Sequence, residues 1–346
     1  MPCSIGLCGQ WNSAPSMVIA RYYHTATLLN SGQVLVTGGL KTLAVVTASS
    51  EIYDPSSGKW NSTTSMATAR QTHTATLLNS GQVLVTGGAN TSSINIATCE
   101  IYDPSTGKWN STTSMAIARY LHTATLLNSG KVLVTGGYGL SSPFASCEIY
   151  DPSTGKWNST TNMATARYLH TATLLNSGKV LVTGGVNALS YITASCEIYD
   201  PSTGLWNSAP SMATARYLHT ATLLNSGKVL VTGGLNTSLL STPSCEIYDP
   251  STGKWNSATS MATARELHTA TLLNSGKVLV TGGVAGSSVT ATCEIYDPSA
   301  DQWNSTTNMT MIREIHTATL LNSGKVLVTG GWGSTGYLAS SEIYNP

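Results

Sequence analysis

The sequence predicts an all-β protein, a seven-bladed β-propeller of four-stranded antiparallel blades. One observation is that a segment like residues 219–234 recurs seven times, opened each time by a histidine, at intervals of 48 or 49 residues. The other is that each copy holds four short strand-like segments separated by turn signals. A single copy is too small to bury its own apolar face, so neighbouring copies must stack to form a core.

The fifth repeat displays the four expected strands in order. Residues 219–224 alternate and end in a Ser-Gly turn, and residues 228–232 form a β-branched run closed by two glycines. Residues 244–249 follow a variable loop, and a Pro-Ser-Thr-Gly turn leads into residues 254–257. Residues 261–265, Met-Ala-Thr-Ala-Arg, connect to the next repeat and are too few to sustain a helix.

These markers resemble the kelch repeat family. The matching features are the diglycine after the second strand, the Glu-x-Tyr-Asp-Pro segment, the tryptophan beyond that tyrosine, and the Met-x-x-x-Arg linker. The resemblance covers essentially residues 10–346, read as one domain with a tail at 1–9 and seven repeats over 24–346. It implies the β-propeller fold and, most often, a binding role.

The two ends of the repeat array predict how the ring closes. The last repeat supplies three strands, at roughly 316–345, and no fourth. Residues 10–14 carry the fourth-strand motif with no repeat before it. We therefore expect residues 10–14 to complete blade seven and so to remove the open sheet edge.

Composition narrows the classes of partner. The net charge is +1, so nothing favours nucleic acid or an anionic membrane. No apolar run reaches the roughly 18 to 20 residues of a membrane-spanning helix, so membrane insertion is not expected. Low charge and abundant Ser and Thr favour an extracellular over a cytoplasmic location.

Cysteine placement separates two groups. Five cysteines precede the Glu of a Glu-Ile-Tyr motif, and we expect small buried thiols there: Cys99, Cys147, Cys196, Cys245 and Cys293. Cys3 and Cys8 stand outside the repeats and could form a disulfide.

Seven Asn-x-Ser/Thr sequons are candidate glycosylation sites if the protein is secreted from a eukaryotic cell. Several arise because Trp-Asn-Ser-Thr-Thr is itself a repeated segment. They lie at Asn61, Asn90, Asn110, Asn158, Asn236, Asn304 and Asn308.

Sequence variation concentrates in the loop after the diglycine and in the linker before each histidine, and both are expected on one face of the ring. The residue two before the histidine is aromatic in four repeats, Tyr22, Tyr120, Tyr168 and Tyr217, and Gln71, Glu266 or Glu314 in the others. The loops add further aromatic side chains, at Tyr138, Phe144, Tyr191, Trp332 and Tyr337. These residues either pack locally or form a stacking surface for a peptide or sugar.

All seven arginines occupy one repeat position, and each repeat also supplies one glutamate. A guanidinium–carboxylate pair in each blade is one interpretation, since pairing satisfies both groups where burial of either alone is costly. The resemblance to kelch substrate adaptors allows another, in which the arginines bind an acidic peptide. They are Arg21, Arg70, Arg119, Arg167, Arg216, Arg265 and Arg313.

The seven histidines suggest no metal site, because a seven-fold ring holds equivalent side chains apart while metal ligands must lie about 2 Å from one ion. We expect the imidazoles to hydrogen-bond neighbouring backbone or the glutamate. Near-identical blades also lack the local asymmetry of a nucleophile, base and stabiliser. No cofactor and no catalytic residue is predicted.

We therefore expect a non-catalytic interaction module that binds a protein, peptide or glycan on its variable face. A structural subunit of an extracellular assembly or coat, self-assembling and possibly glycosylated, is the alternative. A galactose-oxidase-like or carbohydrate-active enzyme is the third reading.

Overall fold

The structure is a computed structural model, which describes residues 9–42, 45–92 and 94–346. The predicted Cys3–Cys8 disulfide lies outside this range. The described residues contain strands and turns but no helix, so no helix there could span a membrane.

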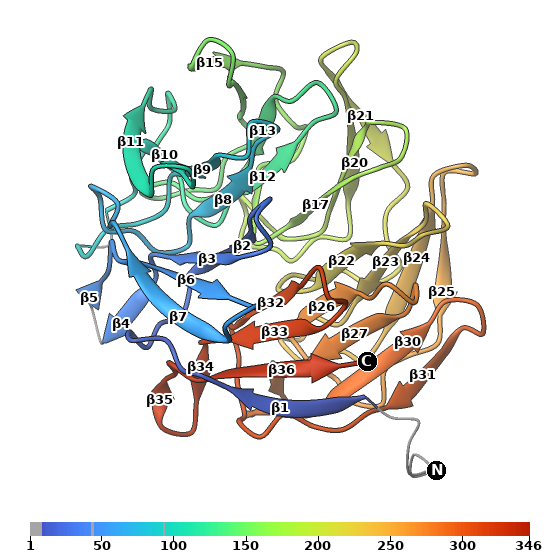
Figure 1. Ribbon diagram of the computed structural model, residues 1–346. Coiled ribbons are helices and arrows are strands. Elements are labelled where there is room, and N and C mark those ends of the chain that lie inside the picture. Colours follow the sequence, from blue (N-terminus) through green and yellow to red (C-terminus); the bar gives the residue numbers. More distant parts are fainter. Residues whose placement is uncertain (1–8, 43–44, 93) are drawn as a thin grey trace.

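Seven four-stranded antiparallel sheets form the blades, as predicted (Figure 1). Each blade runs from an innermost to an outermost strand, called here strands a, b, c and d. The first three blades are β2 (Thr25–Leu28), β3 (Val34–Thr37), β6 (Ser50–Asp54) and β7 (Lys59–Thr63); β8 (Thr74–Leu77), β9 (Val83–Thr86), β10 (Cys99–Asp103) and β11 (Lys108–Thr112); and β12 (Thr123–Leu126), β13 (Val132–Thr135), β14 (Cys147–Asp151) and β15 (Lys156–Ser159).

The remaining four blades repeat this order, the last of them with a strand from the other end of the chain. They are β17 (Thr171–Leu174), β18 (Val180–Thr183), β20 (Cys196–Asp200) and β21 (Leu205–Ala209); β22 (Thr220–Leu223), β23 (Val229–Thr232), β24 (Cys245–Asp249) and β25 (Lys254–Ala258); β26 (Thr269–Leu272), β27 (Val278–Thr281), β30 (Cys293–Asp297) and β31 (Gln302–Ser305); and β32 (Thr317–Leu320), β33 (Val326–Thr329), β36 (Ser341–Asn345) and β1 (Gln10–Ala14).

Short two-stranded sheets decorate the loops and were not predicted from the sequence. Three are hairpins between strands b and c, and one joins a linker to the start of such a loop. They are β4 (Leu40–Thr42) with β5 (Val45–Val46), β28 (Val284–Ala285) with β29 (Ser288–Val289), β34 (Trp332–Gly333) with β35 (Gly336–Tyr337), and β16 (Arg167–Tyr168) with β19 (Val186–Asn187).

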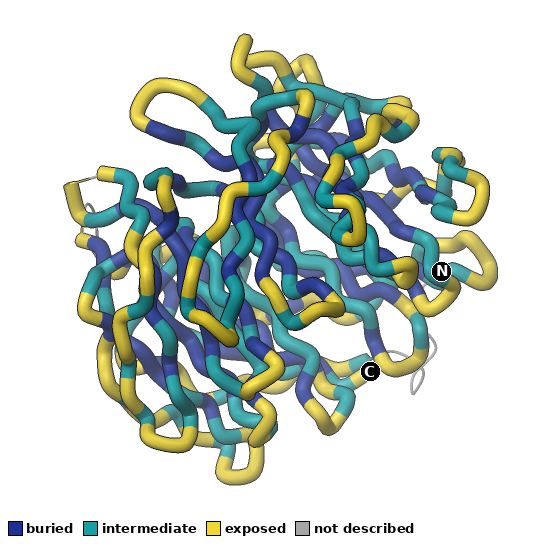
Figure 2. The backbone as a smooth tube through the Cα atoms, turned by 90° about the horizontal axis from the view of Figure 1, so that it is seen from above, coloured by how far each residue is buried: buried dark blue, intermediate teal, exposed yellow. Residues whose placement is uncertain are grey.

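The innermost strands surround the propeller axis, each beside those of the two neighbouring blades (Figure 1). Because strands alternate in direction, the b–c loops and d–a linkers emerge on one face, which we call the loop face. The a–b and c–d turns emerge on the other, the turn face. Figure 2 shows the buried residues along the middle of the blades and the exposed ones at the turns and loops.

Closure by the N-terminal strand is confirmed. β1 pairs antiparallel with β36 from Gln10 opposite Asn345 to Ala14 opposite Ser341. Trp11 stacks on Tyr344 with ring centroids 5.1 Å apart, as Trp60 stacks on Tyr53 at 5.2 Å within blade one. Blade seven therefore contains both ends of the repeat array and has the same internal packing as the others.

The core lies between blades. Val278 and Val280 of blade six pack against Leu224, Leu230 and Cys245 of blade five, and all five side chains are buried. The Val-Leu-Val run of strand b supplies both faces of a sheet, so it is apolar throughout instead of alternating. The five repeat cysteines are buried and free, and burial raises the pKa of the Cys245 thiol to about 12.

Two glycines end strand b because no other residue fits there. Gly233 and Gly234 have φ of 63° and 92°, in the left-handed region that favours glycine. A Cβ on Gly233 would lie 2.4 Å from the carbonyl oxygen of Arg265 in the next blade, and one on Gly234 would lie 2.5 Å from that of Tyr217. The diglycine thus lets adjacent blades approach in direct backbone contact.

Removing residues 1–14 should lower the unfolding midpoint sharply, because it strips blade seven of its outer strand and of the Trp11–Tyr344 contact. Loss of a large apolar contact of this kind costs about 3 kcal/mol or more. Thermal unfolding followed by circular dichroism measures the change. Gln10→Ala, an exposed position of the same strand, should leave the midpoint nearly unchanged, and a deletion variant equal to it would contradict the closure.

Candidate functional site

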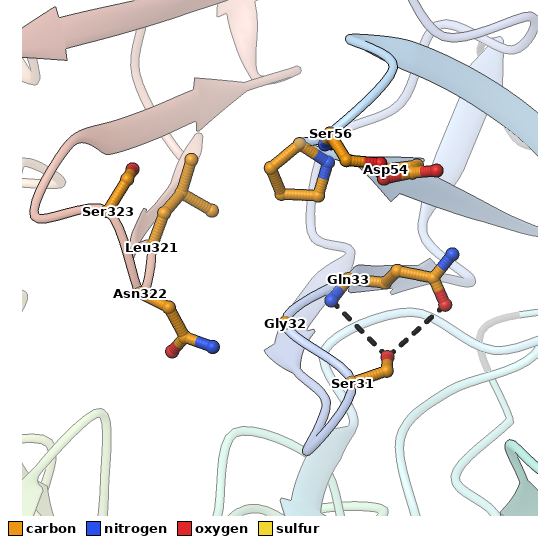
Figure 3. A pocket seen from close by; sticks show the side chains of 9 residues that line it. Ser31, Gly32, Gln33, Asp54, Ser56, Leu321, Asn322 and Ser323 are labelled. Atoms are coloured by element: carbon orange, nitrogen blue, oxygen red, sulfur yellow. Dashed lines mark hydrogen bonds between the residues drawn. The ribbon is translucent and has the colours of Figure 1, made fainter.

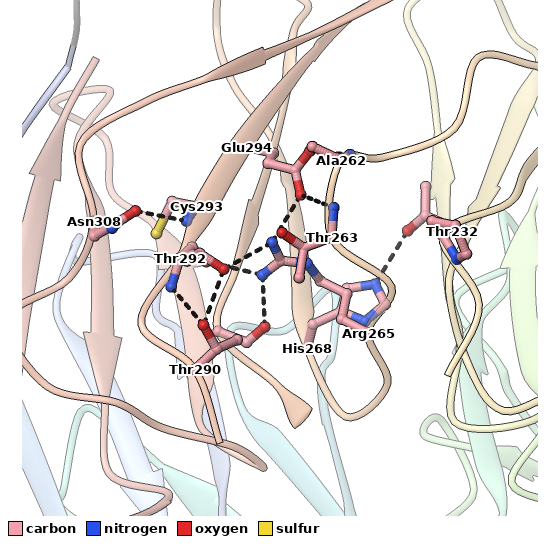
Figure 4. Close-up of polar contacts among 12 residues, drawn as sticks. Thr232, Ala262, Thr263, Arg265, His268, Thr290, Thr292, Cys293, Glu294 and Asn308 are labelled. Atoms are coloured by element: carbon pink, nitrogen blue, oxygen red, sulfur yellow. Dashed lines mark hydrogen bonds and ion pairs between the residues drawn. The ribbon is translucent and has the colours of Figure 1, made fainter. Parts of the chain in front are cut away.

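Each arginine joins three parts of its own blade, as blade six illustrates (Figure 4). Arg265 Nη1 donates to the carbonyl oxygens of Gly282 and Thr292, both at 2.8 Å. Its Nη2 donates to Glu294 Oε1 at 2.8 Å and to Thr292 Oγ1 at 3.0 Å. Glu294 also accepts from the linker amides of Ala262, at 2.6 Å, and Thr263, at 3.1 Å. Linker, strand b and strand c are thereby held together.

The same ion pair recurs in all seven blades, with N···O distances from 2.8 to 3.0 Å. Every arginine side chain is 0% exposed, so none is available to a ligand in this structure. The pairing interpretation is confirmed, and the acidic-peptide interpretation is corrected for all seven positions. The cause is burial, which a repeated Arg and a repeated Glu do not reveal by spacing alone. The pairs are Arg21–Glu51, Arg70–Glu100, Arg119–Glu148, Arg167–Glu197, Arg216–Glu246, Arg265–Glu294 and Arg313–Glu342.

The arginine backbone connects one blade to the next. The carbonyl of Arg265 accepts from Gly234 of the preceding blade at 2.8 Å. At the closing interface, Arg21 accepts from Gly331 at 2.9 Å, so the bond runs around the whole ring. One residue type therefore serves both the blade, through its side chain, and the interface, through its carbonyl.

The histidines also join blades, through threonine hydroxyls, where neighbouring backbone or the glutamate was expected. His268 Nε2 lies 3.1 Å from Thr220 Oγ1 and 3.1 Å from Thr232 Oγ1, both in the preceding blade. Burial, and then the charge of Arg265, lower the pKa of His268 to about 3. The imidazole is therefore neutral, and a threonine hydroxyl can donate to its Nε2.

A belt of strained backbone lies next to each histidine. The residue before it adopts φ between 50° and 55° in every blade, although none is glycine: Tyr23, Thr72, Leu121, Leu169, Leu218, Leu267 and Ile315. This conformation costs on the order of 1 kcal/mol or more per residue. In five places the amide donates to the equivalent carbonyl of the preceding blade, as in Ile315 to Leu267 at 3.2 Å. At these five positions a hydrogen bond around the axis offsets part of that cost.

Immediately outside this belt stands the axial ring, which we define as the residue preceding each strained one. Each member pairs through its backbone with the first residue after the diglycine of its own blade, such as Glu314 with Trp332. These pairs fix the ring at the loop-face end of the innermost strands. Its members are Tyr22, Gln71, Tyr120, Tyr168, Tyr217, Glu266 and Glu314.

The predicted aromatic residues form two clusters on the loop face. Tyr22 lies 6.0 Å from Trp332 and 5.2 Å from Tyr337 between ring centroids, across the interface of blades seven and one. Tyr138 lies 5.8 Å from Tyr120 and 4.9 Å from Tyr168, across the interface of blades three and four. Local packing and partial exposure thus coexist, since Trp332 and these tyrosines are neither fully buried nor fully exposed.

Tyr217 stands outside both clusters, beside the acidic part of the axial ring. Burial raises its pKa, and the charge of Glu266 adds to the shift. Burial raises the pKa of Glu314, and again the charge of Glu266 adds to it. The two carboxylates are therefore neighbours, with a tyrosine beside them in blade five.

Exposed apolar side chains gather on the loop face. Of nine large exposed hydrophobic residues among those the structure describes, eight lie in b–c loops or a d–a linker. A groove of about 410 Å³ lies between the loops of blades two and three, lined by Ile94, Leu140 and Phe144 among others. The eight are Val18, Val45, Ile94, Leu140, Leu189, Tyr191, Leu239 and Leu240, and Leu205 alone is on the turn face.

The turn face is polar and nearly uniform. In blades three to six a lysine before strand b pairs with the aspartate ending strand c, as Lys277 does with Asp297 at 3.1 Å. The groove between blades seven and one has a volume of about 470 Å³, and Pro55 and Leu321 are the apolar side chains on its otherwise polar walls (Figure 3). Ser31 and Gln33 hydrogen-bond each other there instead of projecting into it.

The candidate glycosylation sites fall into two environments. Asn61, Asn110, Asn158 and Asn304 are exposed on outer strands, and Asn308 is exposed in a linker. Asn90 and Asn236 instead begin b–c loop turns, where their side chains accept backbone hydrogen bonds from Ser92 and Ser238.

Comparisons with known proteins agree with this architecture. Residues 23–234 match the family described as the KLHDC2/KLHL20/DRC7 Kelch-repeats domain, and residues 215–262 and 268–310 match the Kelch motif. The chain belongs to the kelch-repeat family of β-propellers. No curated protein matches it. A solved structure titled as a novel fungal alcohol oxidase of the AA5 family in complex with copper is similar in fold, with a TM-score of 0.80 and 19% identity over 98% of this chain and 76% of that one.

The copper named in that title has no matching ligand set here. Among the described residues, no three His, Cys, Asp or Glu side chains converge as metal ligands. Each histidine is engaged with threonine hydroxyls of the adjacent blade, as His316 is with Thr269 and Thr281. The residues present therefore do not fit such a centre, and the likeness is one of fold.

Arg265→Ala should destabilise the protein by about 3 to 5 kcal/mol, because it leaves Glu294 buried without its cation. Lys277→Ala is the matched control in the same blade, since its pair with Asp297 is half exposed and should be worth less than about 1 kcal/mol. Urea unfolding measures both. Equal losses in the two variants would contradict a structural role for the arginine.

Acidification should unfold the propeller cooperatively. Burial holds the histidine pKa values below 6.5 in the folded protein, to about 3 for His24, His122 and His268. Below about pH 6.5 the unfolded chain binds more protons, so stability present above that pH is lost as pH falls toward the folded values. Glu266 and Glu314 act in the opposite direction, because their pKa values are raised in the folded protein. Unfolding releases at most two protons from them, which reduces the net uptake.

About four to six protons should therefore be taken up on unfolding near pH 5.5, which is a slope of roughly 6 to 9 kcal/mol per pH unit. Urea unfolding between pH 8 and the acid midpoint gives this number. His219→Gln should reduce it by one. A slope of fewer than two protons would mean that the histidines are not held neutral.

Proposed function

We propose that this protein is a non-catalytic interaction module whose loop face docks a protein partner. The observation that carries the proposal is the segregation of exposed apolar side chains onto the b–c loops. Contiguous exposed apolar surface is typical of protein interaction sites. Among the described residues, the charged turn face exposes only one large apolar side chain, Leu205, although grooves of about 530 and 660 Å³ lie there between blades.

The loop tips of blades two to five supply the anchors. Leu140 is 90% exposed, Leu189 73% and Leu239 66%, and nothing in the fold requires apolar residues at such positions. The groove beside Leu140 is of a size to receive one large apolar side chain of a partner. The aromatic clusters of Tyr22 and Tyr138 extend the surface toward the axis.

A non-catalytic role is supported by the arrangement of the reactive groups. The histidines and the repeat cysteines are buried within interfaces, and the arginines are consumed by ion pairs. What remains accessible on the loop face is mainly apolar, aromatic or uncharged polar, with the axial carboxylates and Lys41 as its charged groups, a composition suited to recognition.

Leu140→Ser with Leu189→Ser should weaken binding of face-specific ligands at least tenfold. A random peptide display library selected on the immobilised wild-type protein supplies these ligands, and their dissociation constants are then measured on variants. Leu205→Ser is the control, because it removes an equally apolar, 52% exposed side chain from the turn face. Binders that lose affinity for the control, or that ignore the loop variant, would count against the proposal.

A structural subunit of a glycosylated extracellular assembly is the second candidate. The exposed sequons on outer strands d, at Asn61, Asn110, Asn158 and Asn304, favour it because glycans there would project from the rim and leave both faces clear. Mass spectrometry of the native protein decides. A monomer without glycans would exclude this candidate and leave the docking module.

A further inference from the structure

The axial ring contains charge that the fold does not neutralise. Glu266 is only 6% exposed, and its sole side-chain hydrogen bond among the described residues comes from the Ser241 hydroxyl to Oε2. Glu314, half buried beside it, makes no side-chain hydrogen bond within the described part of the chain. A buried carboxylate without a cation is costly, so a fold retains one at a free surface only with a compensating gain.

The nearest arginines in sequence do not supply that cation. Arg265 and Arg313 directly precede the two glutamates, but their guanidinium groups are fully buried against Glu294 and Glu342. No ion pair joins either axial carboxylate to a Lys, Arg or His anywhere in residues 9–42, 45–92 and 94–346. A cation for these carboxylates would therefore have to come from outside the described fold.

The two faces differ in their charge. Setting aside the seven internal Arg–Glu pairs, 10 lysines, 7 aspartates and 2 glutamates remain, and nine of those lysines and all the aspartates lie in or beside the turns of the turn face. The loop face keeps Glu266, Glu314 and Lys41, a balance of −1. The axial carboxylates are therefore nearly the only charges on the loop face, so few neighbouring charges compete with a cation that approaches them.

Aromatic rings flank the carboxylates on both sides. Tyr217 precedes Glu266 around the ring, and its pKa is raised by burial and then by the charge of Glu266. Tyr22 follows Glu314, whose charge adds to the burial and the Tyr337 contact that raise the tyrosine pKa. Tyrosine faces attract organic cations. Two carboxylates between two tyrosines suit an ammonium or guanidinium group, whereas Ca²⁺ or Mg²⁺ needs six or more oxygen ligands.

We propose that Glu266 and Glu314, between Tyr217 and Tyr22, bind a lysine or arginine side chain of the protein segment that docks on the loop face. The inference rests on the proposed function and specifies the partner: a segment whose apolar side chains cover the loop tips and whose basic residue reaches the axis. The basic residue of the segment is recognised by charge at the axis, and its apolar side chains are recognised by contact with the loop tips.

Four matched peptides, acetyl-Ala-Leu-X-Leu-Ala-amide with X as Lys, Arg, Gln or Glu, test the assignment. Titrations followed by the side-chain ¹³C carbonyl signals at positions 266 and 314, carboxyl in the wild type and amide in the Gln variant, give the dissociation constants at pH 7. The Lys or Arg peptide should bind at least tenfold more tightly than the Gln peptide and shift both carboxyl signals. Equal affinities for Lys, Arg and Gln would overturn the proposal.

Glu266→Gln with Glu314→Gln should remove the tenfold preference and leave the Gln peptide unaffected. The chain itself carries Gln71 at the equivalent position of blade two, so this exchange is compatible with the blade. Adding Gln71→Glu to the double variant returns one charge elsewhere in the ring. If that restored the preference, the effect would be the overall charge of the face, and the assigned site would be wrong.

The design separates the two proposals. If the Gln peptide and the library-selected binders fail to bind the wild type, the docking function fails, and N-acetyl-lysine methylamide alone then tests the site through the same two carboxyl signals. A shift of those signals upholds the cation site, and their constancy overturns it. If all four peptides bind with equal dissociation constants, the docking function is supported and the cation site is contradicted.

Discussion

The buried arginine is the group on which the rest of this propeller depends. Its guanidinium binds the glutamate of strand c and the carbonyl that follows strand b, while the glutamate holds the linker amides. Without it, three segments of each blade would present unpaired polar groups to the core. The arginine carbonyl then meets the diglycine of the preceding blade. Blade and interface are thereby built from one residue.

The position of the histidine in each blade depends in turn on this arginine–glutamate pair. Because the linker is fixed by the glutamate, the histidine that follows is placed against the threonines of the preceding blade. The strained residue before each histidine adds, at five of the seven interfaces, a backbone hydrogen bond to the preceding blade. Two blades vary the scheme: Ser50 and Ser341 replace the cysteine, and the strand b hydroxyls of Thr37 and Thr329 bond these serines instead of a histidine. The Thr329 exchange affects the closing interface, through His24, and the Thr37 exchange affects the interface of blades one and two, through His73.

The period and strand signals were sufficient to predict the fold, because every blade repeats them in register. Strand boundaries in the fifth repeat differ from expectation by one residue, as at Thr220 in place of His219. The site was less predictable. Whether Arg265 faces a ligand or Glu294 depends on burial between sheets, which one-dimensional spacing does not encode. Likewise, nothing in the sequence marks Leu267 as a residue with positive φ, since its backbone hydrogen bonds around the axis are made with residues of other blades. The sequence shows that the axial position changes from tyrosine in blade five to glutamate in blade six. That Tyr217 and Glu266 are neighbours follows only once the blades are arranged in a ring.

The closing strand has a mechanical consequence. Gln10 and Asn345 pair at the same end of the β1–β36 ladder, and the strands run antiparallel from there. Tension applied between these two residues would load one pair of backbone bonds at a time and peel the strand away. A ladder pulled along its length would instead load all its bonds together. The ring can thus resist heat through seven equivalent interfaces and still open under a small force, if that force acts at this one corner.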